Sequence, residues 1–252
     1  MAQSAVDGLR VSDIGGHRLQ DGRWFRSGLV FRISGGMVGA AEFDHLDAIG
    51  LRVLVDLRGE DEDRHALEDW AQSRGVVYAL EPISFGNAAD LAAAMAEVGL
   101  TEADGRAYLQ RIYRRILDEF GASLVGAVTA IATTQPAGFG CAAGKDRTGL
   151  LTALVQEVLG VERSAVIAGY VSQAPDPGRL REAVGTWRNW DLGDLTGPGV
   201  GAILTAVEEV MADALGYLDE RYGGAVRYFE AAGLPAGTID LLRRHLVADE
   251  PD

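Results

Sequence analysis

The sequence is poor in the residues that build disulfides and metal sites. Cys141 is the one cysteine among 252 residues, so no disulfide can form within the chain. The four histidines, His17, His45, His65 and His245, lie far apart and show no metal-ligand spacing. We therefore predict that the protein binds no metal ion and needs no other cofactor.

Long apolar runs and excess positive charge are also missing from the sequence. No apolar segment reaches the ~20 residues needed to span a bilayer, and the first residues lack the basic and apolar regions of a secretory signal. These absences predict a soluble, cytoplasmic protein without stable membrane insertion, with export by a route that uses no such signal as the alternative. The net charge of −14 argues against nucleic-acid binding, because affinity for a long polyanion comes largely from neutralising its phosphates. A protein of this charge that handles phosphate must do so in a local pocket.

Composition and patterning predict a single α/β domain over residues 1–252. Hydrophobic residues make up 48% of the chain and charged residues 24%, which suits a globular protein with a sizeable core. Apolar, β-branched runs predict strands, and periodic runs bounded by capping residues or glycine predict helices. The expected strands lie within 24–34 and at 51–57, 76–80 and 137–140, and the expected helices at 40–49, 102–120, 123–134, 148–159, 162–172, 202–215, 225–232 and 238–246.

This order of elements predicts a small central sheet, rich in parallel strands and flanked by helices. Extra helices within 88–120, within 176–215, or in both are expected to form a lid. The acidic run at 60–63 is predicted to lie in the first turn of a helix that ends at Arg74, because acidic side chains suit the positive end of a helix dipole.

Residues 138–149, GFGCAAGKDRTG, contain the pattern that points most directly to chemistry. They follow a predicted strand and open a predicted helix. A glycine-containing turn at this place exposes backbone N–H groups at the positive end of the helix, which is a binding site for anions. Lys145, the one lysine of the chain, lies in the same segment.

A nucleotide-binding P-loop of the form G-x-x-x-x-G-K-[ST] does not fit this segment. Phe139 stands where the first glycine is required, counting back from Lys145. Asp146 stands where the hydroxyl ligand of magnesium is required, and its charge would repel a nucleotide phosphate.

The pattern C-x5-R, from Cys141 to Arg147, fits the segment better. Five intervening residues can curl around a tetrahedral oxyanion, with the cysteine sulfur below the phosphorus and the arginine fork on two oxygens. The helix N-terminus and Arg147 favour a nucleophilic thiolate, to which Thr148 can donate a hydrogen bond. Gly144 can supply a backbone conformation that other residues resist. The plainer alternative is a buried cysteine before a helix, flanked by charges.

The segment CAAGKDRTG resembles the phosphate-binding loop CxxGKDRTG of the bacterial atypical protein tyrosine/serine phosphatases. Further likenesses to this family lie at 12–16 (SDIGG), 25–28 (FRSG), 55–58 (VDLR) and 222–246. The resemblance implies a cysteine-phosphatase fold with extra helices over the site. It also implies activity on phosphotyrosine, often with phosphoserine, phosphothreonine or phosphoinositides as further substrates. One position departs from the family pattern, because Gly140 replaces the histidine that usually precedes the nucleophile and helps to hold the loop and the thiolate.

Under this hypothesis Cys141 forms a phosphocysteine intermediate that water hydrolyses. Arg147 and the loop from Ala142 through Ala143, Gly144 and Lys145 to Thr148 bind the phosphoryl group and stabilise the transition state. No metal ion is required, because the arginine and the backbone amides supply the positive field.

A general acid must protonate the leaving oxygen, and the sequence offers two candidates. Asp56 ends a predicted buried strand, where active sites of α/β proteins assemble, but it could instead cap the following turn. Asp146 lies within the loop, but it could instead be the structural partner of an arginine, Arg58 or Arg26. The sequence does not separate the two candidates.

Two further basic residues are candidates for substrate binding. Lys145 would add positive charge at the rim of the pocket and select acidic or phospholipid head groups, or it could be a solvated loop residue. Arg58 would help to bind substrate, or it could form a surface salt bridge. The aromatic residues Tyr108, Tyr113, Trp187 and Trp190 could line a substrate cover, although core packing is the commoner role of such residues.

The function that these patterns predict is hydrolysis of phosphate monoesters through a phosphocysteine. Phosphotyrosine is the expected substrate, with phosphoserine and phosphothreonine as further ones, and the expected partners are a phosphorylated protein or a phospholipid. The alternatives are a phosphatase acting on phosphoinositides or small metabolites, and a catalytically weak module that only binds phosphate.

Overall fold

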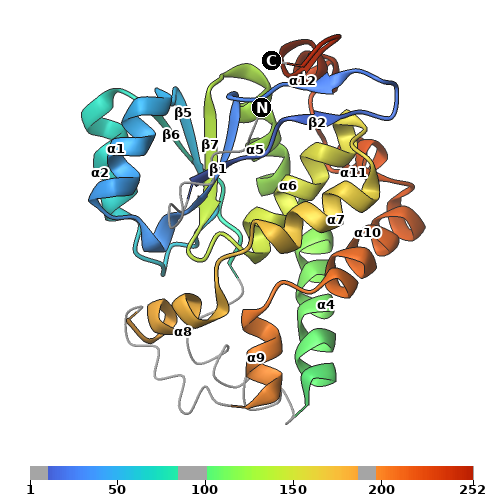
Figure 1. Cartoon of the computed structure of the whole chain (residues 1–252). Coiled ribbons are helices and arrows are strands. Elements are labelled where there is room, and N and C mark those ends of the chain that lie inside the picture. Colours follow the sequence, from blue (N-terminus) through green and yellow to red (C-terminus); the bar gives the residue numbers. More distant parts are fainter. Residues whose placement is uncertain (1–10, 85–100, 187–196, 252) are drawn as a thin grey trace.

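A five-stranded sheet forms the centre of the molecule (Figure 1). The computed structural model describes residues 11–84, 101–186 and 197–251, with the backbone alone at 37 and 182–186. The strands lie in the order β1 (Val11–Asp13), β4 (Val30–Ser34), β7 (Ala137–Cys141), β5 (Val53–Asp56) and β6 (Val77–Leu80). The last four are parallel and β1 is antiparallel to β4. The predicted α/β fold with a parallel-rich sheet is confirmed.

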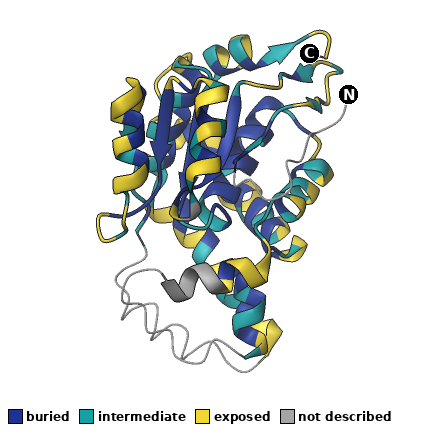
Figure 2. Cartoon of the chain, turned by 60° about the vertical axis from the view of Figure 1, so that its left-hand side comes forward, coloured by how far each residue is buried: buried dark blue, intermediate teal, exposed yellow. Residues whose placement is uncertain are grey.

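Helices cover both faces of this sheet because alternate strand residues point to opposite sides. On β5, Val53 and Val55 join one hydrophobic cluster and Leu54 joins the other. Helices α1 (Ala40–Ile49) and α2 (His65–Arg74) pack on the side of Leu54, and α5 (Gly121–Thr133) and α6 (Asp146–Leu159) pack on the other (Figure 1). Figure 2 shows the strands buried between helices whose outward faces are exposed.

Helix α4 (Glu102–Glu119) begins where the sequence predicts, at a capping box in which Thr101 and Asp104 bind each other's backbone amides. Its first part packs against α9 (Pro198–Leu204), beside α8 (Pro177–Thr186) and away from the sheet (Figure 1). The two helices approach closely because Gly105 has no side chain: a Cβ there would lie 2.3 Å from the Gly199 carbonyl oxygen. These helices lie within the ranges predicted for a lid, and two parts of those ranges, 88–100 and 187–196 with Trp187 and Trp190, lie outside the described residues.

The single helix predicted over 202–215 is wrong. Helix α9 ends at Leu204, and α10 (Glu208–Tyr222) begins only after an extended segment. Thr205 and Val207 both have extended backbone angles. The restart is favourable because Glu208 and Glu209 then fall in the first turn of α10, at the positive end of its dipole.

The segment 24–34, predicted as one strand leading into a loop, contributes to two sheets instead. Gly28, at φ 75°, separates β3 (Trp24–Phe25) from β4. Strand β3 lies between β2 (His17–Arg18) and β8 (Val247–Ala248) in a small antiparallel sheet. This sheet joins the two ends of the described chain.

The remaining helices follow the predictions closely. Helices α7 (Arg163–Ser172), α11 (Ala225–Ala231) and α12 (Thr238–Leu246) lie within a residue or so of the expected ranges, and a short 3₁₀ helix, η1 (Gly35–Met37), follows β4. In the described parts of the chain, no helix taken singly has the length and apolar composition to cross a membrane. Helices α4 and α5 taken together have the required length and apolar composition, but the chain bends by 76° between them.

Candidate active site

The candidate site lies at the carboxyl edge of the central strands, where sites of α/β proteins commonly form. Cys141 ends β7 and Asp146 begins α6, so the C-x5-R segment forms the connection between them. In the sheet register Ser34 is the partner of Cys141, and Asp56 is the partner of Gly140. The ends of β4, β7 and β5 therefore meet at this loop.

The backbone N–H groups of the loop have no acceptor among the residues that the structure describes. Within the described residues, none of the N–H groups from Ala142 to Asp146 donates to another backbone group. The carbonyl groups of the loop do have donors outside it: the amide of Gly36 donates to Ala142 O (2.9 Å) and the amide of Gly149 to Lys145 O (2.9 Å). Consecutive unpaired amides before a helix form a concave site for an anion.

Gly144 allows the loop to turn. Its φ of 68° lies in the left-handed region, and a Cβ at this position would come within 2.4 Å of Ser34 Oγ. Both the backbone conformation and the close approach of β4 therefore require glycine, as the sequence predicts.

The Cys141 side chain lies at the base of this loop and is 2% exposed. Thr148, one turn into α6, donates from Oγ1 to Cys141 Sγ over 3.1 Å. This is the hydrogen bond expected from the sequence.

Arg147 is held by Glu62, a residue that the sequence analysis missed. Its Nη2 lies 2.8 Å from Glu62 Oε1, Nη1 contacts Oε2, and Nη1 also donates to Ile83 O over 3.1 Å. Glu62 Oε2 in turn accepts from the amide of Gly59 over 2.8 Å. This two-point ion pair fixes the plane of the guanidinium beside the loop.

The electrostatics of the pair favour both charges. Burial opposes the charge of Glu62, but the Arg147 guanidinium outweighs that effect and lowers the pKa of Glu62 below its ordinary value. Burial likewise opposes the charge of Arg147, but Glu62 and then Cys141 raise the Arg147 pKa.

The acidic run that contains Glu62 is a loop, so its predicted place in the first turn of a helix is wrong. Helix α2 begins only at His65, and Glu62 turns toward Arg147 instead. Nothing in the composition of the run distinguishes Glu62 from its acidic neighbours.

Asp56 and Arg58 form a buried ion pair with each other. Arg58 Nη2 lies 2.6 Å from Asp56 Oδ2, and Nε and the backbone amide of Arg58 also donate to the carboxylate. Tyr78 OH donates to Asp56 Oδ2 over 2.6 Å. Both charged residues are 2% exposed, so they brace the ends of β5 and β6 rather than facing solvent.

Asp146 lies in a second polar cluster, beside the loop. Its Oδ1 accepts from Lys145 Nζ (2.5 Å) and from Tyr113 OH (3.0 Å), and Tyr113 OH is 2.8 Å from Tyr170 OH. The Asp146 side chain is 27% exposed, whereas that of Lys145 is 2% exposed. Lys145 is therefore buried against Asp146, not at an exposed rim as the sequence suggested. Burial opposes its charge, but Asp146 outweighs burial and raises the Lys145 pKa.

Arg32, from β4, is the second residue of the site that the sequence analysis missed. It is 3% exposed, donates through Nη2 to the Gly144 carbonyl of the loop, and donates through Nη1 to Gln173 Oε1 over 3.3 Å. Burial lowers the pKa of Arg32 to about 10.

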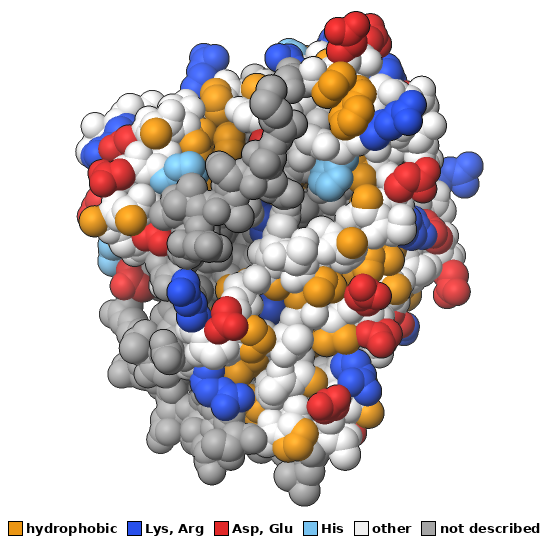
Figure 3. Space-filling model, viewed as in Figure 1, with side chains coloured by type: hydrophobic (Ala, Val, Ile, Leu, Met, Phe, Trp, Pro, Cys, Tyr) orange, Lys and Arg blue, Asp and Glu red, His pale blue; other side chains and the backbone are white. Residues whose placement is uncertain are grey.

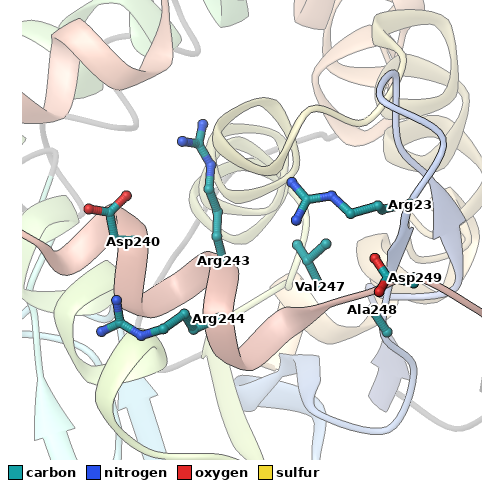
Figure 4. Close-up of a pocket in the computed structure, with 7 residues that line it drawn as sticks. All are labelled: Arg23, Asp240, Arg243, Arg244, Val247, Ala248 and Asp249. Carbon is teal, nitrogen blue, oxygen red and sulfur yellow. The ribbon is translucent and has the colours of Figure 1, made fainter.

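A hollow of about 490 Å³ lies elsewhere on the surface, at α12 (Figure 4). It is lined by Arg23, Asp240, Arg243, Arg244, Val247, Ala248 and Asp249. Arg243, which lines the hollow, donates from Nη2 to Val158 O in the last turn of α6. The C-x5-R loop lies at the other end of this helix, before its first turn. Because a helix rises about 1.5 Å per residue, the length of α6 separates this hollow from Cys141.

No metal cluster accompanies the site in the described parts of the chain. Those residues contain no group of three or more His, Cys, Asp or Glu side chains that could hold a metal ion. Over the described part of the face in Figure 3, acidic and basic side chains are intermixed.

Comparison with known proteins places the chain in a family. Residues 9–248 match the sequence model of the tyrosine phosphatase family. The chain belongs to that family. The match covers the loop from Cys141 to Arg147, Glu62 and Arg32, and it agrees with the resemblance noted from the sequence. Membership in the family supports hydrolysis of phosphate esters as its chemistry.

Individual relatives of this phosphatase-family chain are distant. It is 29% identical over 147 residues to the triple specificity protein phosphatase PtpB of Mycobacterium tuberculosis, an alignment that covers 54% of this chain and 53% of PtpB. It thus spans about half the length of that relative. It is 25% identical over 223 residues to a tyrosine-protein phosphatase of Nostoc commune, covering 84% of this chain and 71% of the relative.

Solved structures overlap with it only weakly. The catalytic core of Siw14 has a TM-score of 0.40 at 14% identity and covers 71% of this chain and 87% of its own. A second structure of that domain, of the PP-IP phosphatase SIW14 from S. cerevisiae with citrate, has a TM-score of 0.35 at 13% identity, with 71% and 88% covered.

Proposed function

We propose that the protein hydrolyses phosphate monoesters, with phosphotyrosine as its principal substrate, through a covalent phosphocysteine on Cys141. The observation that carries this proposal is the run of unpaired amides from Ala142 to Asp146 beside the sulfur, with the Arg147 guanidinium fixed next to them. Family membership supports the same chemistry.

The reaction follows from this arrangement in two steps. The Cys141 thiolate attacks phosphorus, the S–P bond forms, and the P–O bond to the leaving group breaks. The loop amides and Arg147 bind the equatorial oxygens, where charge accumulates in the transition state. Water then attacks the phosphocysteine, which releases inorganic phosphate and restores the thiolate. As the S–P bond breaks, the Thr148 hydroxyl donates a hydrogen bond to the departing sulfur.

Of the two candidate acids, Asp146 is the one we assign. Asp56 is enclosed, and both of its carboxylate oxygens accept hydrogen bonds from Arg58. Asp146 is partly exposed beside the loop, and its Oδ1 alone has donors among the described residues, so Oδ2 can face the leaving oxygen.

Phosphoserine, phosphothreonine and phosphoinositides are the further substrates in this proposal. The name of PtpB, a triple specificity phosphatase, supports testing more than one class. A module that binds phosphate without turnover is the alternative, and it rests on Gly140 in place of the expected histidine.

The proposal is tested by hydrolysis of p-nitrophenyl phosphate and by binding of vanadate. Cys141→Ser is expected to abolish turnover and to retain vanadate binding, because the amides and Arg147 remain. Arg147→Lys is expected to weaken vanadate binding through loss of the fork, whereas the same change at the exposed Arg74 on α2 has no effect. Turnover by Cys141→Ser would contradict the phosphocysteine. Phosphopeptide binding without turnover by the unaltered protein would favour the binding module.

The role of Asp146 is tested with two leaving groups. Asp146→Asn is expected to slow hydrolysis of phenyl phosphate far more than that of p-nitrophenyl phosphate, whose leaving group needs little protonation. Asp56→Asn is the matched change and is expected to affect both substrates equally. The reverse pattern would assign the acid to Asp56. A panel of phosphotyrosine peptide, phosphoserine peptide and phosphoinositide vesicles then ranks the substrate classes.

A further inference from the structure

Three buried or nearly buried cations belong to the loop after Cys141 or contact it, and they differ in their partners. The charge of an ionised Cys141 would raise the pKa of each of the three, Arg32, Lys145 and Arg147. Arg147 forms an ion pair with the carboxylate of Glu62, and Lys145 forms one with the carboxylate of Asp146. Arg32 has two neutral acceptors, Gly144 O and Gln173 Oε1.

Among the described residues, no carboxylate forms an ion pair with Arg32. An enclosed charge without a counter-ion is strongly unfavourable. The depression of its pKa, to about 10, reflects that burial and still leaves the guanidinium charged at neutral pH. Cys141 ends the neighbouring strand, and the negative charge of its ionised sulfur would raise the pKa of Arg32.

The register of the sheet explains how Arg32 reaches the site. Arg32 is the partner of Phe139 across β4 and β7, and Ser34 is the partner of Cys141. Alternate residues of a strand share a face, so Arg32 and Cys141 lie on the same side of the sheet as diagonal neighbours. Helix α6 packs on this side, where Phe139 and Cys141 belong to one cluster.

The residue directly before the nucleophile cannot supply this charge. A Cβ at Gly140 would lie 2.3 Å from the Ile33 carbonyl oxygen of β4, so no side chain fits there. A positive group for the sulfur must then come from elsewhere in the fold, and Arg32 of β4 lies two residues before Ser34, the register partner of Cys141.

We propose that Arg32 is a positioning residue for the reaction: its guanidinium is the counter-cation of the Cys141 thiolate, and its bond to Gly144 O holds the loop open toward an anion. The proposal rests on the proposed function only in that Cys141 acts as a thiolate. Lys145 and Arg147 contribute to the same field, each already paired with a carboxylate, and Thr148 donates a neutral hydrogen bond.

The test is the pH dependence of alkylation of Cys141 by iodoacetamide, which reports the thiolate fraction and needs no substrate. Cys141 is the one cysteine of the chain, so the label is unambiguous. Arg32→Met is expected to move the pH midpoint of alkylation upward by about one unit, which is about a tenfold loss of thiolate below the midpoint. Arg32→Lys keeps the positive charge, so its midpoint is expected to lie close to that of the unaltered protein. Gln173→Met, which removes the other partner of Arg32 and no charge, is expected to leave the midpoint in place.

An unchanged midpoint in folded Arg32→Met, or equal shifts in Arg32→Met and Arg32→Lys, would overturn the proposal and leave Arg32 a purely structural role. If Arg32→Met does not fold, Arg32→Lys decides: a midpoint close to that of the unaltered protein supports the proposal, and a shift of about one unit overturns it. A normal alkylation response in a protein that does not hydrolyse p-nitrophenyl phosphate would refute the proposed function and leave this inference standing.

A double-mutant cycle on thermal unfolding gives a second readout. At a pH where the thiolate forms, Arg32→Met is expected to destabilise the unaltered protein more than it destabilises Cys141→Ser, because the serine variant has no anion for the guanidinium to pair with. Equal destabilisation in the two backgrounds would show that the two side chains are not coupled.

Discussion

Glu62 binds Arg147 with both carboxylate oxygens, although the two residues are 85 positions apart in the sequence. Glu62 is carried by the loop after β5, and Arg147 by the first turn of α6. The Gly59 amide fixes the glutamate in turn. The loop between β5 and α2 thereby sets the orientation of the cation that grips the phosphoryl group in the proposed mechanism.

The first prediction concerns this orientation. Glu62→Gln removes the charge that aligns Arg147, and kcat/KM for p-nitrophenyl phosphate is expected to fall by up to about 100-fold, because small misplacements of a positioned group are costly. Glu60→Gln, an exposed residue of the same acidic run, is the control and is expected to leave kcat/KM unchanged. Equal effects of the two substitutions would mean that net charge, rather than the ion pair, matters.

The second prediction concerns acid stability. The folded state lowers the pKa of Glu62, so the ion pair contributes stability above the unfolded value of about 4.3 and loses it as the pH falls through the lower folded value. The free energy of unfolding of the unaltered protein is therefore expected to exceed that of Glu62→Gln near neutral pH, with the gap narrowing in acid. Urea unfolding of both proteins across this range measures the gap. A gap that stays constant with pH would refute the linkage.

The part of the site that the sequence predicted is the part built by residues close together in the chain. A strand, a glycine turn and a helix start occur in order from Ala137 to Leu159, and this order determines the loop, the position of Gly144 and the Thr148 bond to Cys141. Local geometry is enough to predict these contacts.

The residues that the sequence analysis missed reach the loop from other elements. Arg32 is the one charged residue of strand β4, and its role depends on the register between β4 and β7. Glu62 lies in an acidic run whose composition suits a helix start equally well. The break between α9 and α10 is similar, because the segment at 205–207 carries no proline or glycine to mark it.

The third prediction compares a buried and an exposed ion pair. Asp56→Asn leaves the enclosed Arg58 guanidinium without its counter-ion, and it is expected to lower the free energy of unfolding by about 3–5 kcal/mol. Asp47→Asn breaks the exposed pair with Arg74 and is expected to change stability little. Urea unfolding of the two variants checks the comparison. A small effect at Asp56 would mean that Arg58 has access to solvent.

The fourth prediction concerns the hydroxyl on the sulfur. Thr148→Val keeps the shape of the buried side chain and removes its donor to Cys141 Sγ, so kcat for p-nitrophenyl phosphate is expected to fall by about tenfold or more. Thr148→Ser is expected to retain most of the rate. Thr152→Val is the control, because Thr152 Oγ1 donates to Thr148 O and no bond joins it to the sulfur. A loss in Thr152→Val as large as that in Thr148→Val would assign the effect to the helix.

The fifth prediction concerns the missing side chain before the nucleophile. Gly140→Ala places a Cβ 2.3 Å from the Ile33 carbonyl oxygen, and backbone on both strands must shift to relieve the contact. We expect a loss of stability of about 1–3 kcal/mol, the usual range for overpacking. Gly169→Ala, in α7 with no neighbouring atom within 4 Å, is the matched control and is expected to stabilise the protein slightly.

Thermal unfolding of the two alanine variants separates the explanations for this glycine. If Gly140→Ala is as stable as Gly169→Ala, strand β4 can move away, and the space beside Cys141 would admit a larger residue such as histidine. If Gly140→Ala is destabilised as expected, the close approach of β4 excludes any side chain at this position. The close approach of β4 also brings Arg32 to the Gly144 carbonyl of the loop. In that case strand β4 has two effects: it excludes a side chain at position 140, and it carries the proposed counter-cation of Cys141.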